Sequence, residues 1–210
     1  MPRLHFWYEF ASTYSYLSAM RIEGRCAAVG IDVIWHPFLL GPIFLAQGWT
    51  TSPFNIYEAK GRYMWRDLER RAAAQGLPGV HRPDPFPQNG LLAARIATIG
   101  AEAAWGPDFT RSVYTAQFAK GACISDPETL AALLESLGQP GSQIVHRAQT
   151  DPAVKDGLRK STNTAQSLDL FGAPSFITDD AELFWGDDQL EEAIGWAACP
   201  KTCARRLPSC

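Results

Sequence analysis

Strand-forming sequence lies at the two ends of this chain, and a long strand-poor stretch separates them. At the N-terminal end, residues 4–10 are rich in aromatic side chains, which suit a pleated strand, and residues 31–36 alternate well enough to predict a second strand. Between them, apolar residues at helical spacing over residues 14–29, stopped by Gly30, predict a helix. Such a crossover joins parallel strands, so this end is predicted to be a β-α-β unit.

The C-terminal end returns to strands. Residues 171–177 and 182–185 predict two short strands, and residues 189–196 predict a closing helix. Pro174 at the start of the first strand is compatible with a cis X-Pro turn, which leaves the backbone of the preceding residue free for a ligand. An ordinary edge-strand proline with a trans bond is the alternative.

The middle of the chain predicts helices. A proline-rich stretch at 81–90 must be irregular, and Ser125 with Glu128 forms a capping-box pattern at the start of a helix. Helices are predicted over residues 55–75, 91–104, 107–120, 125–138 and 151–168. The predicted fold class is therefore α/β, a β-α-β / β-β-α domain interrupted by an all-helical insertion. The predicted domains are 1–39 with 151–198, an insertion at 40–150, and a C-terminal tail at 199–210.

The composition excludes several classes of function. The 210 residues are 46% hydrophobic and carry a net charge of −3, which argues against a nucleic-acid or anionic-membrane surface. No apolar run reaches membrane-spanning length, and the N-terminus lacks a signal-peptide pattern, so a cytoplasmic protein is expected.

The five cysteines suggest neither a disulfide framework nor a metal site. Their number is odd and their spacing wide, and the cluster of Cys199, Cys203 and Cys210 has no histidine nearby to complete a ligand set. A loose tail is the expected structure there, and no metal is predicted.

Ser12 stands where the first strand ends and the first helix begins. Backbone N–H groups at a helix start are unpaired and favour negative charge. A redox-active protein would carry Cys-x-x-Cys at such a place, with an acidic thiol. Here the residues are Ser12-Thr13-Tyr14-Ser15, so the chain is not expected to be an oxidoreductase but could stabilise the thiolate of another molecule. Taken alone, Ser12 could equally be a helix N-cap.

Taken together, the motifs resemble the glutathione-dependent 2-hydroxychromene-2-carboxylate isomerases, within the DsbA-like and kappa-class glutathione transferase group. The family motifs follow in order over nearly the whole chain: Tyr8-Glu9-Phe10-Ala11-Ser12-Thr13-Tyr14-Ser15-Tyr16-Leu17, Ser52-Pro53-Phe54-Asn55, Lys60-Gly61-Arg62-Tyr63-Met64, Phe171-Gly172-Ala173-Pro174-Ser175-Phe176 and Phe184-Trp185-Gly186-Asp187-Asp188. The resemblance implies a thioredoxin-like fold with a helical insertion, glutathione as cofactor and a homodimer.

The resemblance also implies roles for individual residues. Ser12 matches the serine that hydrogen-bonds the glutathione sulfur, and the backbone of Ala173 matches the group that pairs with the cysteinyl part. Asp187 and Asp188 match the positions that hold the γ-glutamyl end, and Asn55 matches an asparagine near the substrate. If the family resemblance is set aside, the pattern predicts that Asp187 and Asp188 are helix caps and that Asn55 is a helix N-cap.

This sequence departs from the family pattern at three places. Thr13 replaces a proline that often follows the serine, and Ala173 replaces a valine before Pro174; neither change removes a functional group. Residues 40–51 offer no basic side chain to meet a substrate carboxylate, so the identity of the aromatic substrate stays open.

The reaction implied is the cis–trans isomerisation of an aromatic carboxylate in aromatic compound catabolism, with glutathione returned unchanged. Two alternatives stay open: a kappa-class-like glutathione S-transferase, and a non-catalytic thioredoxin-fold binding module. No nucleic-acid or membrane partner is expected.

Overall fold

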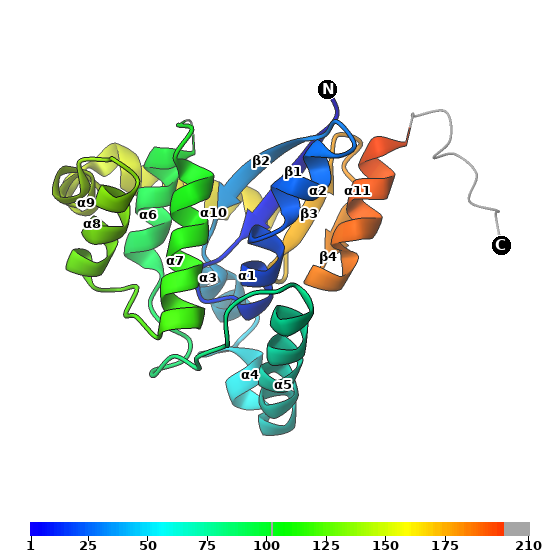
Figure 1. Ribbon diagram of the computed structural model, residues 1–210, viewed down its shortest axis with the longest axis horizontal. Helices are drawn as coiled ribbons and strands as arrows, with labels where there is room; N and C mark the ends of the chain where they lie inside the picture. Colours follow the sequence, from blue (N-terminus) through cyan, green and yellow to red (C-terminus); the bar gives the residue numbers. More distant parts are fainter. Residues whose placement is uncertain (102, 200–210) are drawn as a thin grey trace.

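The computed structural model describes residues 1–101 and 103–199 and has a four-stranded sheet with helices packed around it (Figure 1). The strands are β1 (Arg3–Tyr8), β2 (Asp32–Pro37), β3 (Ser175–Thr178) and β4 (Leu183–Trp185). Their order is β2-β1-β3-β4; β1 runs parallel to β2 and antiparallel to β3, and β4 is antiparallel to β3. The strands from the two ends of the chain therefore form one sheet, and the predicted fold class is confirmed.

Helices account for most of the remaining structure. At the N-terminal end lie α1 (Thr13–Ala19) and α2 (Ile22–Ala27), and at the C-terminal end η1 (Asp187–Gln189) and α11 (Leu190–Ala198). Between β2 and β3 lie α3 (Leu40–Ala46), α4 (Pro53–Ile56), α5 (Glu58–Ala74), α6 (Leu91–Gly100), α7 (Gly106–Lys120), α8 (Pro127–Ser136), α9 (Gly141–Thr150) and α10 (Pro152–Ser167).

Several predicted helix boundaries were wrong. The helix predicted over 14–29 is two helices, because the backbone of Arg21 leaves the helical region. The segment Leu40-Gly41-Pro42 begins α3, although glycine and proline together are typical of a loop; proline is tolerated in the first turn of a helix. The N-cap of α8 is Asp126 and not Ser125, because the Asp126 carboxylate accepts the backbone N–H groups of Glu128 and Thr129.

One hydrophobic core joins the sheet to the helices. Aromatic side chains of β1 lie in the same cluster as Tyr114 and Phe118 of α7 and Leu130 of α8. Phe6 and Phe176 stack at 5.6 Å between β1 and β3, which couples the two ends of the chain. The described helices include none with the length and hydropathy needed to cross a membrane. Of the predicted tail, Cys199 is exposed, whereas Cys203 and Cys210 lie outside the described residues.

Candidate functional site

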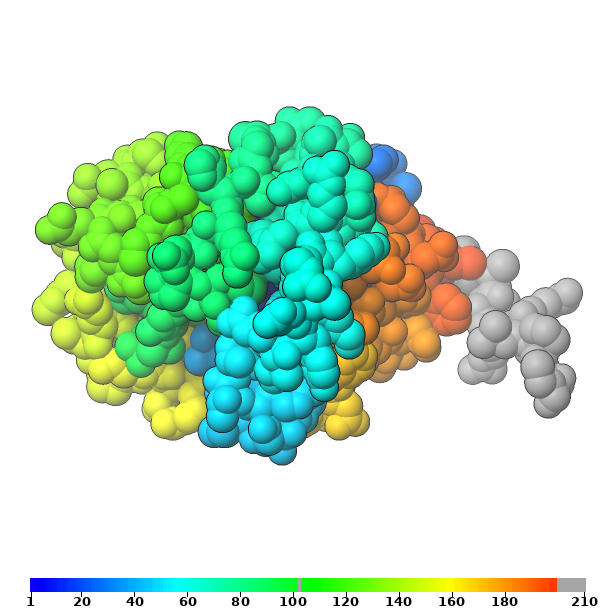
Figure 2. All heavy atoms as spheres, turned by 90° about the horizontal axis from the view of Figure 1, so that it is seen from below, coloured from blue at the N-terminus to red at the C-terminus, as the bar shows by residue number. Residues whose placement is uncertain are grey.

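A cavity of about 1020 Å³ opens at the end of the sheet where β1 meets α1. Its floor consists of the end of β1, the start of α1, residues 171–174 and the start of η1. Its outer wall consists of residues 44–63, which carry the end of α3, α4 and the start of α5. Figure 2 shows this face, with the cyan segment from α3 to α5 lying between the green helical part and the orange C-terminal residues.

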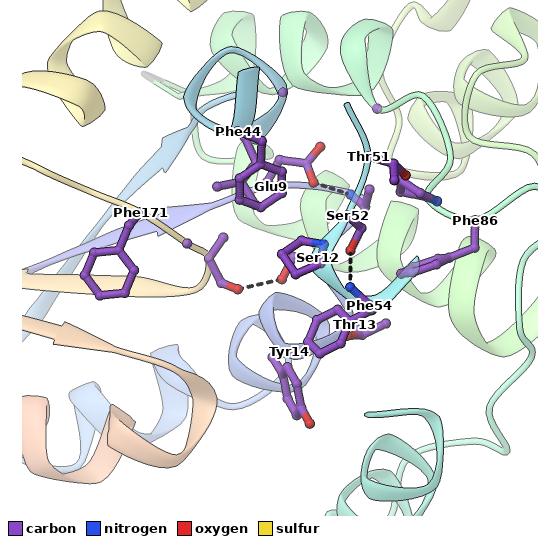
Figure 3. Close-up of a pocket in the computed structure, with 18 of the residues that line it drawn as sticks. Glu9, Ser12, Thr13, Tyr14, Phe44, Thr51, Ser52, Phe54, Phe86 and Phe171 are labelled. Carbon is purple, nitrogen blue, oxygen red and sulfur yellow. Dashed lines mark hydrogen bonds between the residues drawn. The ribbon is translucent and has the colours of Figure 1, made fainter. Parts of the chain in front are cut away.

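Ser12 lies on the floor as the N-cap of α1. Its Oγ accepts the backbone N–H of Ser15 at 3.1 Å and donates to the carbonyl of Ala173 at 2.8 Å (Figure 3). The Ala173–Pro174 peptide bond is cis. Ser12 is therefore the N-cap that local sequence allows, and its hydroxyl also joins the start of α1 to the segment before β3.

Glu9 is an acidic residue on the same floor to which the sequence prediction gave no role. It is partly buried; its Oε2 accepts the N–H of Ala11 at 2.9 Å, and its carbonyl accepts the hydroxyl of Tyr114 at 2.9 Å. Burial raises the pKa of Glu9 to about 8, although the hydrogen bond from Ala11 opposes the shift. The available signal was an acidic residue in an otherwise apolar strand end, but the sequence did not show which way it faced.

Asp187 is almost completely buried beside the floor, at 2% exposure. Its Oδ1 accepts the Ser18 hydroxyl at 2.8 Å and Arg21 at 2.9 Å, and its Oδ2 accepts Arg71 at 3.1 Å. No side-chain capping bond is found at η1 or α11, so the cap interpretation of the aspartates is wrong. Asp187 instead ties α1, Arg21 and α5 to the start of η1.

Asp188 and Asn55 lie in different surroundings. Asp188 is exposed and lines the cavity, so its carboxylate is accessible to a ligand. Asn55 does not line the cavity; its side-chain amide donates to Thr51 Oγ1 at 3.1 Å and to the Phe86 carbonyl at 2.8 Å. It is not an N-cap either, because Ser52 caps α4. The structure thus brings Ser12, Ala173, Asp187 and Asp188 to one cavity, whereas Asn55 belongs to the outer-wall segment without lining the cavity.

Two basic residues line the cavity, and the sequence prediction assigned neither to a ligand. Arg71 bridges Asp67 at 2.9 Å and Asp187 at 3.1 Å. Lys60 is exposed, has no ion pair among the described residues, and holds its Nζ 4.9 Å from the centre of the Tyr57 ring. Lys60 therefore carries a positive charge that no carboxylate of the described residues neutralises, whereas the charge of Arg71 is shared by two carboxylates.

The outer part of the cavity is mostly aromatic. Figure 3 shows Phe44, Phe54 and Phe86 around Ser12. At the other side of the mouth, the rings of Phe171 and Trp185 meet edge to face at 4.9 Å. Such a surface suits a flat apolar ligand with a few polar groups.

Neither a thiol nor a metal cluster is found in this site. None of the described residues that line the cavity is a cysteine. Across residues 1–101 and 103–199, no group of three or more His, Cys, Asp or Glu side chains is placed to hold a metal ion. The polar groups that line the cavity include hydroxyl, carboxyl, amide, ammonium, guanidinium and backbone groups.

Comparison with known proteins agrees with the motifs. The family model described as DSBA-like thioredoxin domain matches residues 3–194. A curated 2-hydroxychromene-2-carboxylate isomerase from Pseudomonas putida is 28% identical over 198 residues, covering 90% of this chain and 93% of that protein. One of the same name from Sphingobium xenophagum is 25% identical over 188 residues, covering 90% and 94%.

Solved structures show the same fold. A selenomethionine structure of a 2-hydroxychromene-2-carboxylate isomerase superposes with a TM-score of 0.82 at 23% identity, over 92% of this chain and 95% of that chain. The resemblance that the motifs predicted is thereby confirmed at the level of the family and the fold.

Proposed function

The chain belongs to the DSBA-like thioredoxin domain family, and on that basis we propose that it is a glutathione-dependent isomerase of the 2-hydroxychromene-2-carboxylate type. Relatives that bear this name match most of the chain. The observation that carries the proposal is the floor of the cavity: a serine hydroxyl is held between a helix start and the Ala173 carbonyl, and none of the described residues that line the cavity is a cysteine. In the proposed reaction the thiol comes from a second molecule, glutathione.

The residues of the cavity fit glutathione by charge and by hydrogen-bonding capacity. Asp188 offers an exposed carboxylate for the α-ammonium of the γ-glutamyl group, and Arg71 offers a guanidinium edge for a carboxylate. The backbone of Ala173 offers polar groups beside Ser12 for the cysteinyl part. Asp187 would act by holding Arg71 in place, because its own oxygens already accept three side chains.

When bound, glutathione supplies a thiolate that adds reversibly to a conjugated double bond and so allows rotation about that bond. The Ser12 hydroxyl stabilises the sulfur anion by rotating away from the Ala173 carbonyl and donating to sulfur. The Ser15 N–H that Oγ accepts polarises the hydroxyl and strengthens it as a donor. One charge-assisted hydrogen bond is worth about 1.5–3 kcal/mol, which corresponds to a thiol pKa lowered by about one to two units.

The rest of the cavity binds the aromatic carboxylate. The rings of the outer wall cover the aromatic group and exclude water. Residues 40–51 contain no basic side chain, and Lys60 binds the substrate carboxylate instead. Lys60 thus supplies the positive charge for the substrate carboxylate that the family motifs did not identify. Reduced glutathione is held in the cytosol, so the cytoplasm is the compartment that we propose for the reaction.

The proposal is tested by titrating glutathione into the wild type, Ser12→Ala and Ser15→Ala while recording thiolate absorbance in the ultraviolet. The wild type and Ser15→Ala should develop the thiolate band near neutral pH, and Ser12→Ala should need a higher pH by about one to two units. Ser15 is the matched control, because it is a buried serine of the same motif. Equal bands in the wild type and Ser12→Ala would refute the role of Ser12.

Product analysis separates the alternative functions. The isomerase should interconvert cis and trans forms of a hydroxybenzylidenepyruvate without consuming glutathione. Rapid formation of a stable conjugate from a chlorinated aromatic compound would favour the transferase. The absence of a heat of glutathione binding in calorimetry would favour a non-catalytic binding module. The expected homodimer is checked by sedimentation of the full chain.

A further inference from the structure

Glu9 is a carboxyl group in the cavity whose two oxygens have different surroundings. Oε2 accepts the Ala11 N–H at 2.9 Å, so a proton on this carboxyl belongs on Oε1. Oε1 faces Gly90: a Cβ atom built at Gly90 would lie 3.2 Å from it and 3.0 Å from Phe10 Cβ. A side chain at position 90 would therefore crowd Oε1, and both Glu9 and Gly90 line the cavity.

The groups around Glu9 do not neutralise it by charge. No ion pair to Glu9 is found among residues 1–101 and 103–199. The segment before α6 and the start of α3 line the cavity with non-ionising side chains, and α7 contributes the Tyr114 hydroxyl, which burial holds in its neutral form by raising its pKa. The ionisable cavity residues of α1, α5 and η1 are Tyr14, Lys60, Tyr63, Asp67, Arg71, Asp187 and Asp188. Because burial also raises the pKa of Glu9 to about 8, its carboxyl is largely neutral at pH 7.

Glu9 is joined to the sulfur-binding position by the backbone. The Ser12 N–H donates to the Glu9 carbonyl at 3.0 Å, so both residues belong to one turn at the end of β1, and both line the cavity (Figure 3). A carboxylate at this place would repel a thiolate, whereas a neutral carboxylic acid would not. A neutral acid can also donate a proton to a substrate that sits against the sulfur.

From this geometry we infer that Glu9 is the catalytic acid and base of the site, acting through Oε1 on the keto oxygen of an aryl-conjugated 2-oxo acid; this inference rests on the proposed isomerase function. As the S–C bond formed, the electron pair of the C=C bond would form a new C=C bond to the keto carbon. The π pair of the carbonyl would move onto the keto oxygen, which would take the proton of Oε1 and leave Glu9 as a carboxylate. After rotation, the proton would return to Oε1, the double bond would re-form and the S–C bond would break. Nothing is oxidised or reduced, and the carboxyl ends in its starting state.

A purely structural role predicts a different outcome for one substitution. In Glu9→Gln the amide oxygen can still accept the Ala11 N–H, so the turn keeps its hydrogen bond, but the transferable proton is lost. If Glu9 only holds the turn, Glu9→Gln should behave like the wild type. Glu182→Gln is the matched control, because Glu182 is exposed and does not line the cavity.

The first readout needs neither glutathione nor substrate. Infrared spectra of the wild type near neutral pH should contain the carbonyl band of a protonated carboxylic acid, which disappears as the pH is raised through about 8. The band should be absent in Glu9→Gln and unchanged in Glu182→Gln. A wild-type spectrum without this band, or a band retained in Glu9→Gln, would overturn the inference.

The second readout is kinetic. Loss of a general acid is expected to lower kcat by about 100-fold or more, with KM changed by less than about threefold. The wild-type kcat should fall as the pH rises through about 8, and that limb should be missing from the residual activity of Glu9→Gln. The thiolate band of bound glutathione should persist in Glu9→Gln, which shows that the fold and the cofactor site are intact.

The two hypotheses fail in distinguishable ways. A wild type that neither binds glutathione nor isomerises the substrate would refute the proposed function, and the infrared band would still report on Glu9. A wild type that isomerises, with a Glu9→Gln variant of equal kcat, would leave the proposed function standing and overturn the role of Glu9.

Discussion

The floor and the outer wall of the cavity are held together in different ways. The floor is fixed by hydrogen bonds between segments far apart in sequence: Ser12 to Ala173, Tyr114 to Glu9, and Ser18 to Asp187. In the outer wall, residues 44–63, side-chain hydrogen bonds are mostly local, and the longest, from Asn55 to Phe86, spans 31 residues.

This difference indicates that the floor and the outer wall contribute to function in different ways. Groups fixed by several distant elements keep their geometry when a ligand arrives, which is what thiolate stabilisation and proton transfer require. A wall built from local turns and aromatic rings can change shape or sequence without disturbing the floor. We expect substitutions of the floor groups that are fixed by distant elements to affect stability and kcat, and substitutions of exposed lining residues to affect ligand binding.

The largest effect is expected from Asp187→Ala on the floor. Removing this carboxylate leaves Arg21 and Arg71 without their shared buried partner, so the free energy of unfolding should fall by about 3 kcal/mol. Urea denaturation measures the change. Asp188→Ala is the control; it should alter stability by less than about 0.5 kcal/mol because Asp188 is exposed. Equal losses in both variants would contradict the division.

Asp188→Ala should instead weaken glutathione binding by about tenfold, equivalent to about 1.4 kcal/mol. The reason is the loss of the proposed partner of the α-ammonium group. Isothermal calorimetry measures the dissociation constant of glutathione in both proteins. Unchanged affinity would remove Asp188 from the cofactor site.

A stability effect that depends on pH is expected from Glu9. Its pKa is raised from 4.5 to about 8 in the folded state, so the folded protein holds the proton more tightly than the unfolded chain. The contribution of the neutral acid to stability is complete below pH 4.5 and is lost as the pH rises through about 8. Urea denaturation at several pH values should therefore show the wild type losing stability relative to Glu9→Gln across this window. Parallel pH profiles would show that Glu9 is not held neutral.

On the wall, Lys60→Met should raise KM for the aromatic carboxylate by about tenfold and leave the glutathione thiolate band unchanged, since a single charge-assisted contact is lost. Arg62→Met is the control, because Arg62 pairs with Glu58 and does not line the cavity. A similar rise in KM for both variants would point to general electrostatic attraction instead of a contact.

The smallest effect is expected from Tyr63→Ala. Tyr63 lines the cavity but is 62% exposed, so KM should rise by about two- to threefold and stability should change by less than about 0.5 kcal/mol. Ile56→Ala, outside the cavity lining, should change neither quantity. A loss of kcat in Tyr63→Ala would break the division between floor and wall.

Local sequence was enough to determine the elements and part of the site. The strand runs at both ends, Ser12 as a helix cap, and the position of Pro174 depend on residues within a few positions of each other, so their patterns could be interpreted directly. Together with the ordered motifs they predicted the α/β fold and the place of Ser12 beside Ala173. Local signals failed at α3, because Gly41 and Pro42 indicate a loop as readily as a first helical turn.

Only the tertiary structure decided what the acidic residues do. Asp187 and Asp188 are adjacent and indistinguishable by pattern, yet one is buried among Ser18, Arg21 and Arg71 and the other faces the cavity. Glu9 is likewise an ordinary strand-end residue until Gly90 and Tyr114, both distant in sequence, enclose it. Burial, ion pairing and pKa depend on which distant segments arrive at a side chain, and that is decided by folding and not by neighbouring residues in the chain.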